Sequence, residues 1–179
     1  MEGKKEEGKS QYLEPPLEED LPLGAETGTV IHAILEHLCK ADLHRSSESF
    51  FSSVLSFCKG SCLEGKEEKV FACIQEVLKH PMDLGGELVS LEQIPSSDIR
   101  VEMEFLYPFQ SSFLKGFIDL IFRYQGRYYI LDWKTNYLGP TKENYSLNNV
   151  EACMNQSGYF LQASIYTTAL QKYLALFEK

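Results

Sequence analysis

Three side chains that could act together on a phosphate ester lie within residues 113–134: Asp119, Asp132 and Lys134. A magnesium ion prefers oxygen ligands and keeps several of its waters, so two neighbouring carboxylates suit it. Such an ion can lower the pKa of a bound water and neutralise charge on a phosphate. A nearby lysine can orient that water or stabilise the transition state. The three residue types therefore fit metal-dependent hydrolysis of a phosphodiester, with Mg2+ expected and Mn2+ or Ca2+ able to take its place.

The spacing of the two aspartates predicts that they face each other across a β-hairpin. Residues 113–123 and 127–134 are rich in aromatic and β-branched side chains, and Gln125-Gly126 supplies a turn. In that register Asp119 lies opposite Asp132, with Cβ atoms roughly 4.5–5.5 Å apart. Two carboxylates about 5 Å apart repel by about 3 kcal/mol at an effective dielectric of about 20. The pair therefore needs a cation, a proton or water, and a loop of odd length would separate it.

Side chains alternate along a strand, so Asp132 and Lys134 share one face of the second arm. Leu131 and Trp133 are expected to pack into the core on the other face. On these residues alone, a solvated strand end explains the pattern as well as a site does. Further polar residues, paired at helical or strand spacing, favour a site: His32 with Glu36, Glu102 with Glu104, and Gln162 with Tyr166.

Hydrophobic spacing predicts helices before and after the strands. In residues 29–40 apolar side chains recur at three- and four-residue intervals, with Thr27 or Thr29 as the cap. A long helix is expected at 157–177, after a polar connection. The other predicted elements are helices at 47–58 and 66–80 and a strand at 100–108. This order predicts an α/β fold, with a small mixed central sheet between helices on its faces.

The composition is that of one globular domain, because 179 residues with 44% hydrophobic content can bury a sizeable core. No apolar run approaches the roughly 20 residues of a membrane span, and the N-terminus lacks a signal-peptide core. The five cysteines lack the spacing of metal ligands. They are interpreted as reduced thiols of a cytoplasmic protein.

Charge divides the chain into two parts. Residues 1–27 hold eight acidic and three basic side chains and three prolines, which predicts a disordered acidic tail or linker. Residues 28–179 form the expected domain and carry −4 of the whole chain's net charge of −9. Phosphate binding normally calls for Lys and Arg, so tight DNA binding by this chain alone is not expected. A catalytic site to which other domains deliver DNA stays compatible with this charge.

Four sequence blocks resemble, in family order, the RecB-type nuclease domain (exodeoxyribonuclease V beta subunit) of the PD-(D/E)XK nuclease superfamily. They are GTVIHAILEHL, VEMEFLYPF, GFIDLIFRYQGRYYILDWKTNYLG and YFLQASIYTTALQKYL, and they cover most of residues 28–174. The resemblance implies a restriction-endonuclease-like core and Mg2+-dependent DNA hydrolysis in recombinational repair. It also implies a helicase domain and RecC- and RecD-like subunits as partners in a larger helicase–nuclease.

The resemblance assigns the metal and the catalytic lysine to matching positions of this sequence. His32, Asp119 and Asp132 would bind the divalent metal, with the backbone carbonyl of Trp133 as a further ligand. Lys134 would be the catalytic lysine of the Asp-x-Lys pair. The expected site therefore joins the first helix to the hairpin.

Two further assignments follow from the same resemblance. Glu104 would be the acidic catalytic-site residue of the first strand, with Glu102 as the less favoured choice. Gln162 and Tyr166 would touch the DNA backbone or support the site, and simple helix packing explains them equally well.

The chain also departs from the family pattern. It has no Walker A motif, so no ATP site is expected in it. Family members continue from the last helix into another strand and helix, so we expect a sheet that lacks its last strand, in a fragment or in a chain completed by a partner. Two other functions stay open: a catalytically silent module that binds a recombination partner, and a stand-alone phage-type exonuclease.

Overall fold

The computed structural model describes residues 21–41, 43 and 46–177. Most of the expected tail, residues 1–20, therefore lies outside the described residues. Helix α1 (Ala25–Ala41) begins three residues before the expected domain boundary at residue 28. Thr29 lies inside this helix and donates its hydroxyl hydrogen bond to the carbonyl of Ala25. The prediction that Thr27 or Thr29 caps the helix is wrong, since both residues lie within its first turns.

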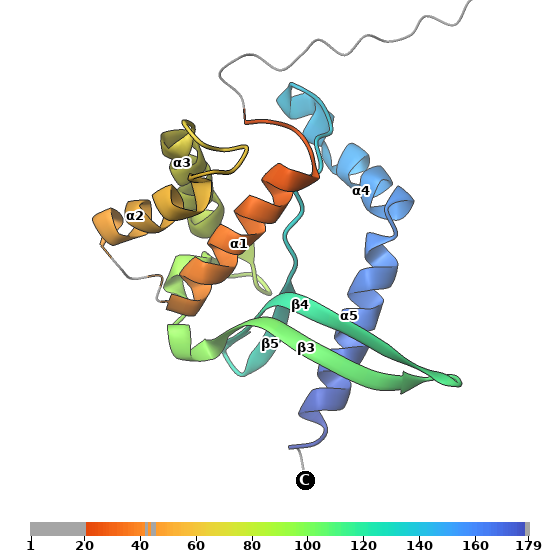
Figure 1. The fold of residues 1–179 in the computed structure, drawn as a ribbon. Helices are drawn as coiled ribbons and strands as arrows, with labels where there is room; N and C mark the ends of the chain where they lie inside the picture. The colour runs from red at the N-terminus through yellow and green to blue at the C-terminus, as the bar shows by residue number, and fades with distance from the viewer. Residues whose placement is uncertain (1–20, 42, 44–45, 178–179) are drawn as a thin grey trace, which may run out of the picture.

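Three helices gather on one side of the molecule (Figure 1). Helix α1 contacts both α2 (Ser47–Cys58) and α3 (Glu67–Lys79). The bounds of α2 are those predicted, and Ser46 accepts a hydrogen bond from the backbone N–H of Ser49 as its N-cap. A small antiparallel pair and three short 3-10 turns complete the described elements: β1 (Met82–Asp83) with β2 (Leu88–Val89), Leu91–Gln93, Ser96–Asp98 and Lys142–Tyr145.

The central sheet has three antiparallel strands in the order β3 (Ile99–Phe109), β4 (Ser112–Tyr124) and β5 (Arg127–Leu131). The pairing of Leu120 with Leu131 has the predicted hairpin register. All strand pairs among the described residues are antiparallel, so these residues do not form the mixed sheet that we expected. The ladder ends at Leu131, one residue before Asp132, so the second arm is shorter than predicted.

Helices α4 (Leu147–Gln156) and α5 (Tyr159–Leu174) lie on the opposite side of the sheet from α1 to α3 (Figure 1). Gly158 separates the two helices with a φ of 72°, a conformation that glycine adopts without a steric penalty. The β3–β4 hairpin extends beyond β5 and crosses α5 (Figure 1). The last helix therefore packs against the long hairpin rather than against the first three helices.

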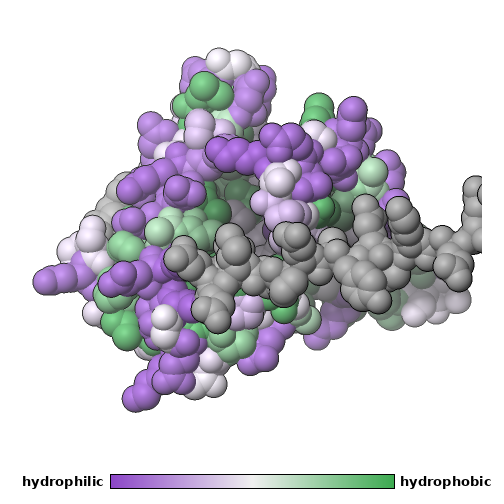
Figure 2. Space-filling model, turned by 90° about the horizontal axis from the view of Figure 1, so that it is seen from above, coloured by the Kyte–Doolittle hydropathy of each residue, from purple (hydrophilic) through white to green (hydrophobic). Residues whose placement is uncertain are grey.

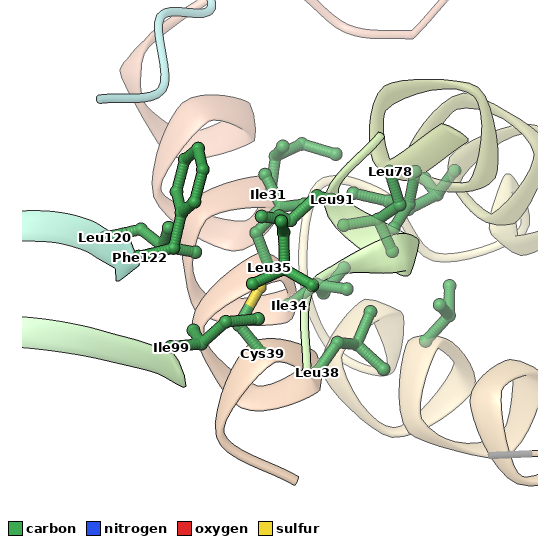
Figure 3. Packing of buried hydrophobic residues seen from close by; sticks show 14 of the residues in the cluster. Ile31, Ile34, Leu35, Leu38, Cys39, Leu78, Leu91, Ile99, Leu120 and Phe122 are labelled. Carbon is green, nitrogen blue, oxygen red and sulfur yellow. The ribbon is translucent and has the colours of Figure 1, made fainter. Parts of the chain in front are cut away.

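Two hydrophobic clusters hold these elements together. In the first, the apolar face of α1 packs against α3 and against one end of the sheet (Figure 3). Leu131 and Trp133 pack against this cluster, as predicted. The second cluster joins the hairpin to α5 through six buried residues: Phe105, Ile118, Ile121, Tyr166, Ala169 and Leu170.

The surface of the face seen in Figure 2 is mainly hydrophilic, with smaller hydrophobic areas between the polar side chains. No helix among the described residues is long and apolar enough to cross a bilayer. All five cysteines lie in the described residues and are free. Burial raises the pKa of Cys39 to about 12, so this thiol is a packing residue rather than a nucleophile.

Candidate active site

Asp119 lies near the middle of β4 and is tied to the chain that follows β5. The backbone N–H of Trp133 donates to its Oδ2 at 2.9 Å, and Nδ1 of His32 lies 3.5 Å from the same oxygen. The Asp119 side chain is 17% exposed. Burial raises the pKa of this carboxyl, the hydrogen bond from Trp133 opposes that shift, and the charge of Asp132 adds to it. His32 and Asp119 are thus brought together from α1 and β4, as predicted.

A close approach between α1 and the segment after β5 positions His32. A Cβ atom at Gly28, in the first turns of α1, would lie 2.7 Å from Oγ1 of Thr135. Only glycine allows the helix to lie this close to Thr135 without a shift. His32 follows Gly28 by one helical turn, so the close approach at Thr135 lies beside the turn of α1 that carries the imidazole.

Asp132 and Lys134 form an ion pair at the end of β5. Their side chains are 20% and 31% exposed. Nζ of Lys134 also lies 4.4 Å from the centre of the Tyr159 ring, and Nε2 of Gln162 donates to Oδ1 of Asp132 at 3.4 Å. Both residues of the predicted Asp-x-Lys pair therefore face the first turns of α5.

Gln162 and Tyr166 link this polar group to the second hydrophobic cluster. Nε2 of Gln162 donates to the hydroxyl of Tyr166 at 2.7 Å, while the Tyr166 ring packs edge-on against Phe105. Burial raises the pKa of Tyr166, and the hydrogen bond from Gln162 opposes that shift. Gln162 thus contacts Asp132 directly, and Tyr166 is joined to that carboxylate through Gln162.

The acid beside Asp119 on β3 is Glu102 rather than Glu104. Glu104 pairs with Phe117, forms an ion pair with Lys115 at 2.7 Å, and is 52% exposed. The register on both sides of Glu102 places it opposite Asp119. Burial raises the pKa of Glu102, and the charges of Glu36 and Asp119 add to that shift. The structure therefore does not bring Glu104 to the other predicted site residues.

Sequence spacing could not choose between Glu102 and Glu104, because the backbone at Glu102 departs from regular strand geometry. Its φ is 49°, which is uncommon for a residue other than glycine and points to a local constraint. On the two sides of Glu102, the β3 side chains enter different clusters: Val101 packs against the first cluster and Met103 against the second. Glu102 thus lies where the hairpin passes from one cluster to the other.

The donor set has the chemistry of a divalent metal site, because it offers two carboxylates and an imidazole. Among the described residues, however, no three His, Cys, Asp or Glu side chains converge closely enough to hold an ion. His32 contacts Asp119, while Asp132 is engaged by Lys134 and Gln162. A cation bound by Asp132 would therefore compete with the Lys134 ammonium for the same carboxylate.

Sequence comparison identifies the family of this chain. A match to the PD-(D/E)XK nuclease superfamily extends over residues 8–177. The chain belongs to the PD-(D/E)XK nuclease superfamily. The α/β fold and the resemblance to RecB-type nuclease domains are thereby confirmed.

Several proteins similar to this chain carry the name RecBCD enzyme subunit RecB. The Chlamydia pneumoniae relative is 35% identical over 164 residues, covering 92% of this chain and 16% of the relative. The Escherichia coli relative is 32% identical over 184 residues, covering 86% of this chain and 15% of the relative. The Chlamydia muridarum relative is 30% identical over 173 residues, covering 94% and 17%. The chain thus spans about a sixth of the length of these relatives.

A groove of about 970 Å3 opens beside the candidate site residues, between β5 and the helices α4 and α5. Asp132, Lys134 and Tyr166 line the part near the end of β5, and Tyr128 and Leu174 also line it. β5 pairs with β4 alone among the described residues, so its other edge faces this groove. The carboxylate and the ammonium of the Asp-x-Lys pair are thus accessible from a concave surface.

Sequence reasoning missed two residues that contact the site. Tyr159 lies over Lys134, and its hydroxyl donates to Oδ1 of Asn136 at 2.9 Å. The spacing holds a signal for both, because Asn136 follows Lys134 by two residues and Tyr159 precedes Gln162 by three. Neither signal is specific alone, since Tyr occurs throughout the last helix.

Proposed function

We propose that this chain is a metal-dependent nuclease module that hydrolyses DNA phosphodiesters within a RecB-like helicase–nuclease. The observation that carries the proposal is the approach of four side chains from three segments of the chain, joined by one backbone amide. His32 contacts Asp119, the Trp133 amide joins Asp119 to the end of β5, and Asp132 pairs with Lys134 there. These residue types, in a chain of a nuclease superfamily, fit phosphodiester hydrolysis better than a solvated strand end.

Each residue of the proposed site has a separable task. Asp119, Asp132 and the imidazole of His32 would hold a divalent cation, with Mg2+ expected and Mn2+ or Ca2+ as substitutes. The cation would supply a water of lowered pKa and charge neutralisation at the phosphate. Lys134 would donate a hydrogen bond to the attacked phosphate or orient the water. The Trp133 amide fixes the orientation of Asp119.

Glu102 takes the place of Glu104 in this proposal. Glu102 lies opposite Asp119 and shares its electrostatic environment, whereas Glu104 lies opposite Phe117 and is paired with Lys115. An acid opposite Asp119 can orient metal-bound water, which an acid two residues further along the hairpin cannot reach. Glu102→Gln should therefore reduce cleavage, and Glu104→Gln, a matched control two residues along the strand, should leave it within about twofold.

The proposed partners follow from the relatives' names and lengths. Proteins named as RecB subunits of a RecBCD enzyme are about six times as long as this chain. We therefore propose that the module works with a helicase domain and with RecC- and RecD-like subunits, in recombinational repair in the cytoplasm. The net charge of −9 agrees with delivery of DNA by other domains.

The decisive experiment separates the lysine from the carboxylates. Single- and double-stranded DNA is incubated with the protein, with and without Mg2+, while calorimetry measures Ca2+ binding. Asp132→Ala should lose both Ca2+ binding and cleavage, and His32→Ala should weaken both. Lys134→Ala should keep Ca2+ binding, or strengthen it slightly, and cut at least about a hundredfold more slowly. Cleavage by Lys134→Ala at the parental rate would refute the catalytic role of Lys134 and the site built on the Asp-x-Lys pair.

The Asp132–Lys134 ion pair favours a second candidate function, a silent module that keeps the fold to bind a recombination partner. In such a module, the ammonium would neutralise Asp132 permanently and no cation would bind there. The same calorimetry distinguishes the two functions, because a silent module would show no Ca2+ binding that depends on Asp132. The stand-alone phage-type exonuclease requires a ring of subunits, which a mass measurement in solution would detect.

A further inference from the structure

Lys134 is held between two different partners in the structure. Its ammonium contacts the carboxylate of Asp132 on one side, and it lies 4.4 Å from the centre of the Tyr159 ring on the other. With only 31% of the side chain exposed, most of its contacts are with protein rather than with water. An ammonium over the face of a tyrosine ring is attracted by the negative face of that ring. The position of the lysine head group is therefore determined by both neighbours.

Tyr159 is itself fixed at both ends. Its backbone begins α5 directly after Gly158, and its hydroxyl donates to Oδ1 of Asn136 at 2.9 Å. Asn136 follows Lys134 by two residues, so the tyrosine bridges the start of α5 to the segment that carries the lysine. The ring is thus anchored on the same short segment whose side chain it contacts.

We propose that Tyr159 is a positioning residue that holds the Lys134 ammonium for catalysis and that Asn136 keeps the ring in place. This inference rests on the proposed nuclease function. The ring contact does not use Asp132, so it stays available to Lys134 when the carboxylate has another ligand. Tyr159 thereby limits the range of positions that a long, flexible lysine side chain can take once its ion pair is broken.

Simple packing is the competing explanation for Tyr159, and it makes different predictions. Removal of a packing residue would reduce cleavage by the same factor with and without the lysine. A positioning residue acts only through Lys134, so the effects of the two substitutions must overlap. A double-mutant cycle therefore tests the proposal directly.

The experiment compares the parental protein with Tyr159→Leu, Lys134→Ala and the double variant. Mg2+-dependent cleavage of an oligodeoxynucleotide is measured under single-turnover conditions. Tyr159→Leu should lower the cleavage rate about tenfold, which corresponds to about 1.4 kcal/mol, with Ca2+ binding and KM unchanged. The double variant should cut no more slowly than Lys134→Ala alone. A further tenfold loss in the double variant would overturn the proposal.

Conservative and control variants complete the test. Tyr159→Phe keeps the ring and should restore cleavage to within about threefold of the parental rate, because cation–π attraction needs no hydroxyl. Tyr173→Leu makes the same change at an exposed tyrosine further along α5 and should leave the rate unchanged. A rate for Tyr159→Phe as low as that of Tyr159→Leu would show that the ring is not the active feature.

A second readout keeps the proposal testable if the parental protein does not cut DNA. The same four proteins are unfolded in urea with chelator present. Coupling between the two side chains predicts that Tyr159→Leu lowers the unfolding midpoint less when residue 134 is alanine. Equal shifts in both backgrounds would refute the contact, whereas coupled shifts without any cleavage would refute only the nuclease function.

Discussion

The two hydrophobic clusters differ in depth, and the candidate site lies between them. The first cluster unites α1, α3 and one end of the sheet, and Ile34, Val54 and Leu120 in it are fully buried. The second joins α5 to the hairpin, and most of its buried residues keep 4% to 9% of their surface exposed. The groove along β5 lies on the side of the second cluster, where Tyr166 and Leu170 line it.

Because the clusters differ in depth, the elements that carry one half of the site are packed more firmly than those that carry the other half. His32 and Asp119 are carried by α1 and β4, which the deep cluster fixes. Gln162, Tyr159 and Tyr166 are carried by α5, whose buried residues all belong to the shallow cluster. We infer that the half formed by His32 and Asp119 is rigid. The half on α5, which contacts Asp132 and Lys134, is easier to displace.

The largest expected effect is on stability and distinguishes the clusters directly. Leu35→Ala, at a 2% exposed position of the first cluster, should lower the free energy of unfolding by about 3–4 kcal/mol. Leu170→Ala, at a 6% exposed position of the second, should cost about 2 kcal/mol because its surroundings can collapse into the groove. Urea unfolding with chelator measures both values.

Function should respond to these two substitutions in the opposite order. Under conditions where both variants stay folded, Leu170→Ala should reduce cleavage more than Leu35→Ala, because it loosens the helix that contacts Asp132 and Lys134. Leu176→Ala, at an exposed position near the end of the chain, serves as a control that changes neither stability nor cleavage. Equal costs for Leu35→Ala and Leu170→Ala would show that the two clusters form one core.

The elements around the first, deeper cluster were predictable from local sequence patterns. The apolar spacing of α1 and the bounds of α2 follow from helical periodicity, and the hairpin register follows from the Gln125-Gly126 turn. The start of α1 was not predictable in this way. The sequence offers Thr27 and Thr29 as caps, and the structure places both inside the helix. Propensity sets the element, and tertiary packing sets its ends.

The proximity of the candidate site residues was predictable, and their detailed geometry was less so. His32, Asp119, Asp132, Lys134, Gln162 and Tyr166 come close together, whereas the choice between Glu102 and Glu104 depended on backbone geometry at Glu102. Strand periodicity gives the two acids the same face and cannot separate them. The contacts of Tyr159 depend on how α5 meets the segment after β5, which no local pattern encodes.

A smaller expected effect tests the contact between α1 and the segment that follows β5. Gly28→Ala should gain about 1 kcal/mol of helix propensity, but its Cβ would lie 2.7 Å from Oγ1 of Thr135. Overpacking of this kind costs about 1–3 kcal/mol, so we expect a net loss of about 1 kcal/mol. In a Thr135→Ala background, the clash disappears and Gly28→Ala should become stabilising. If Gly28→Ala destabilises both backgrounds equally, α1 does not lie against Thr135.

The smallest expected effect concerns the charge of Asp119. Burial raises the pKa of this carboxyl in the folded protein, so its charged form opposes folding. The resulting penalty is absent below the unfolded pKa of about 3.9, grows as the pH rises through the folded pKa, and is fully present at pH 7. Asp119→Asn removes the charge and keeps an acceptor for the Trp133 amide. In chelator at pH 7, this variant should therefore be about 0.5–1 kcal/mol more stable than the parental protein.

Metal should reverse that order if the rigid half of the site binds a cation. Excess Ca2+ at about a hundred times its dissociation constant should stabilise the parental protein by about 2.7 kcal/mol, because ligand binds only the folded state. Asp119→Asn should gain little, so it becomes the less stable of the two. Glu151→Gln, an exposed change on α4, should match the parental protein in both conditions. Thermal unfolding at pH 7, with chelator and with Ca2+, measures all three proteins. An Asp119→Asn variant that is less stable than the parental protein in chelator would show that the Asp119 charge stabilises the metal-free fold, contrary to the burial argument.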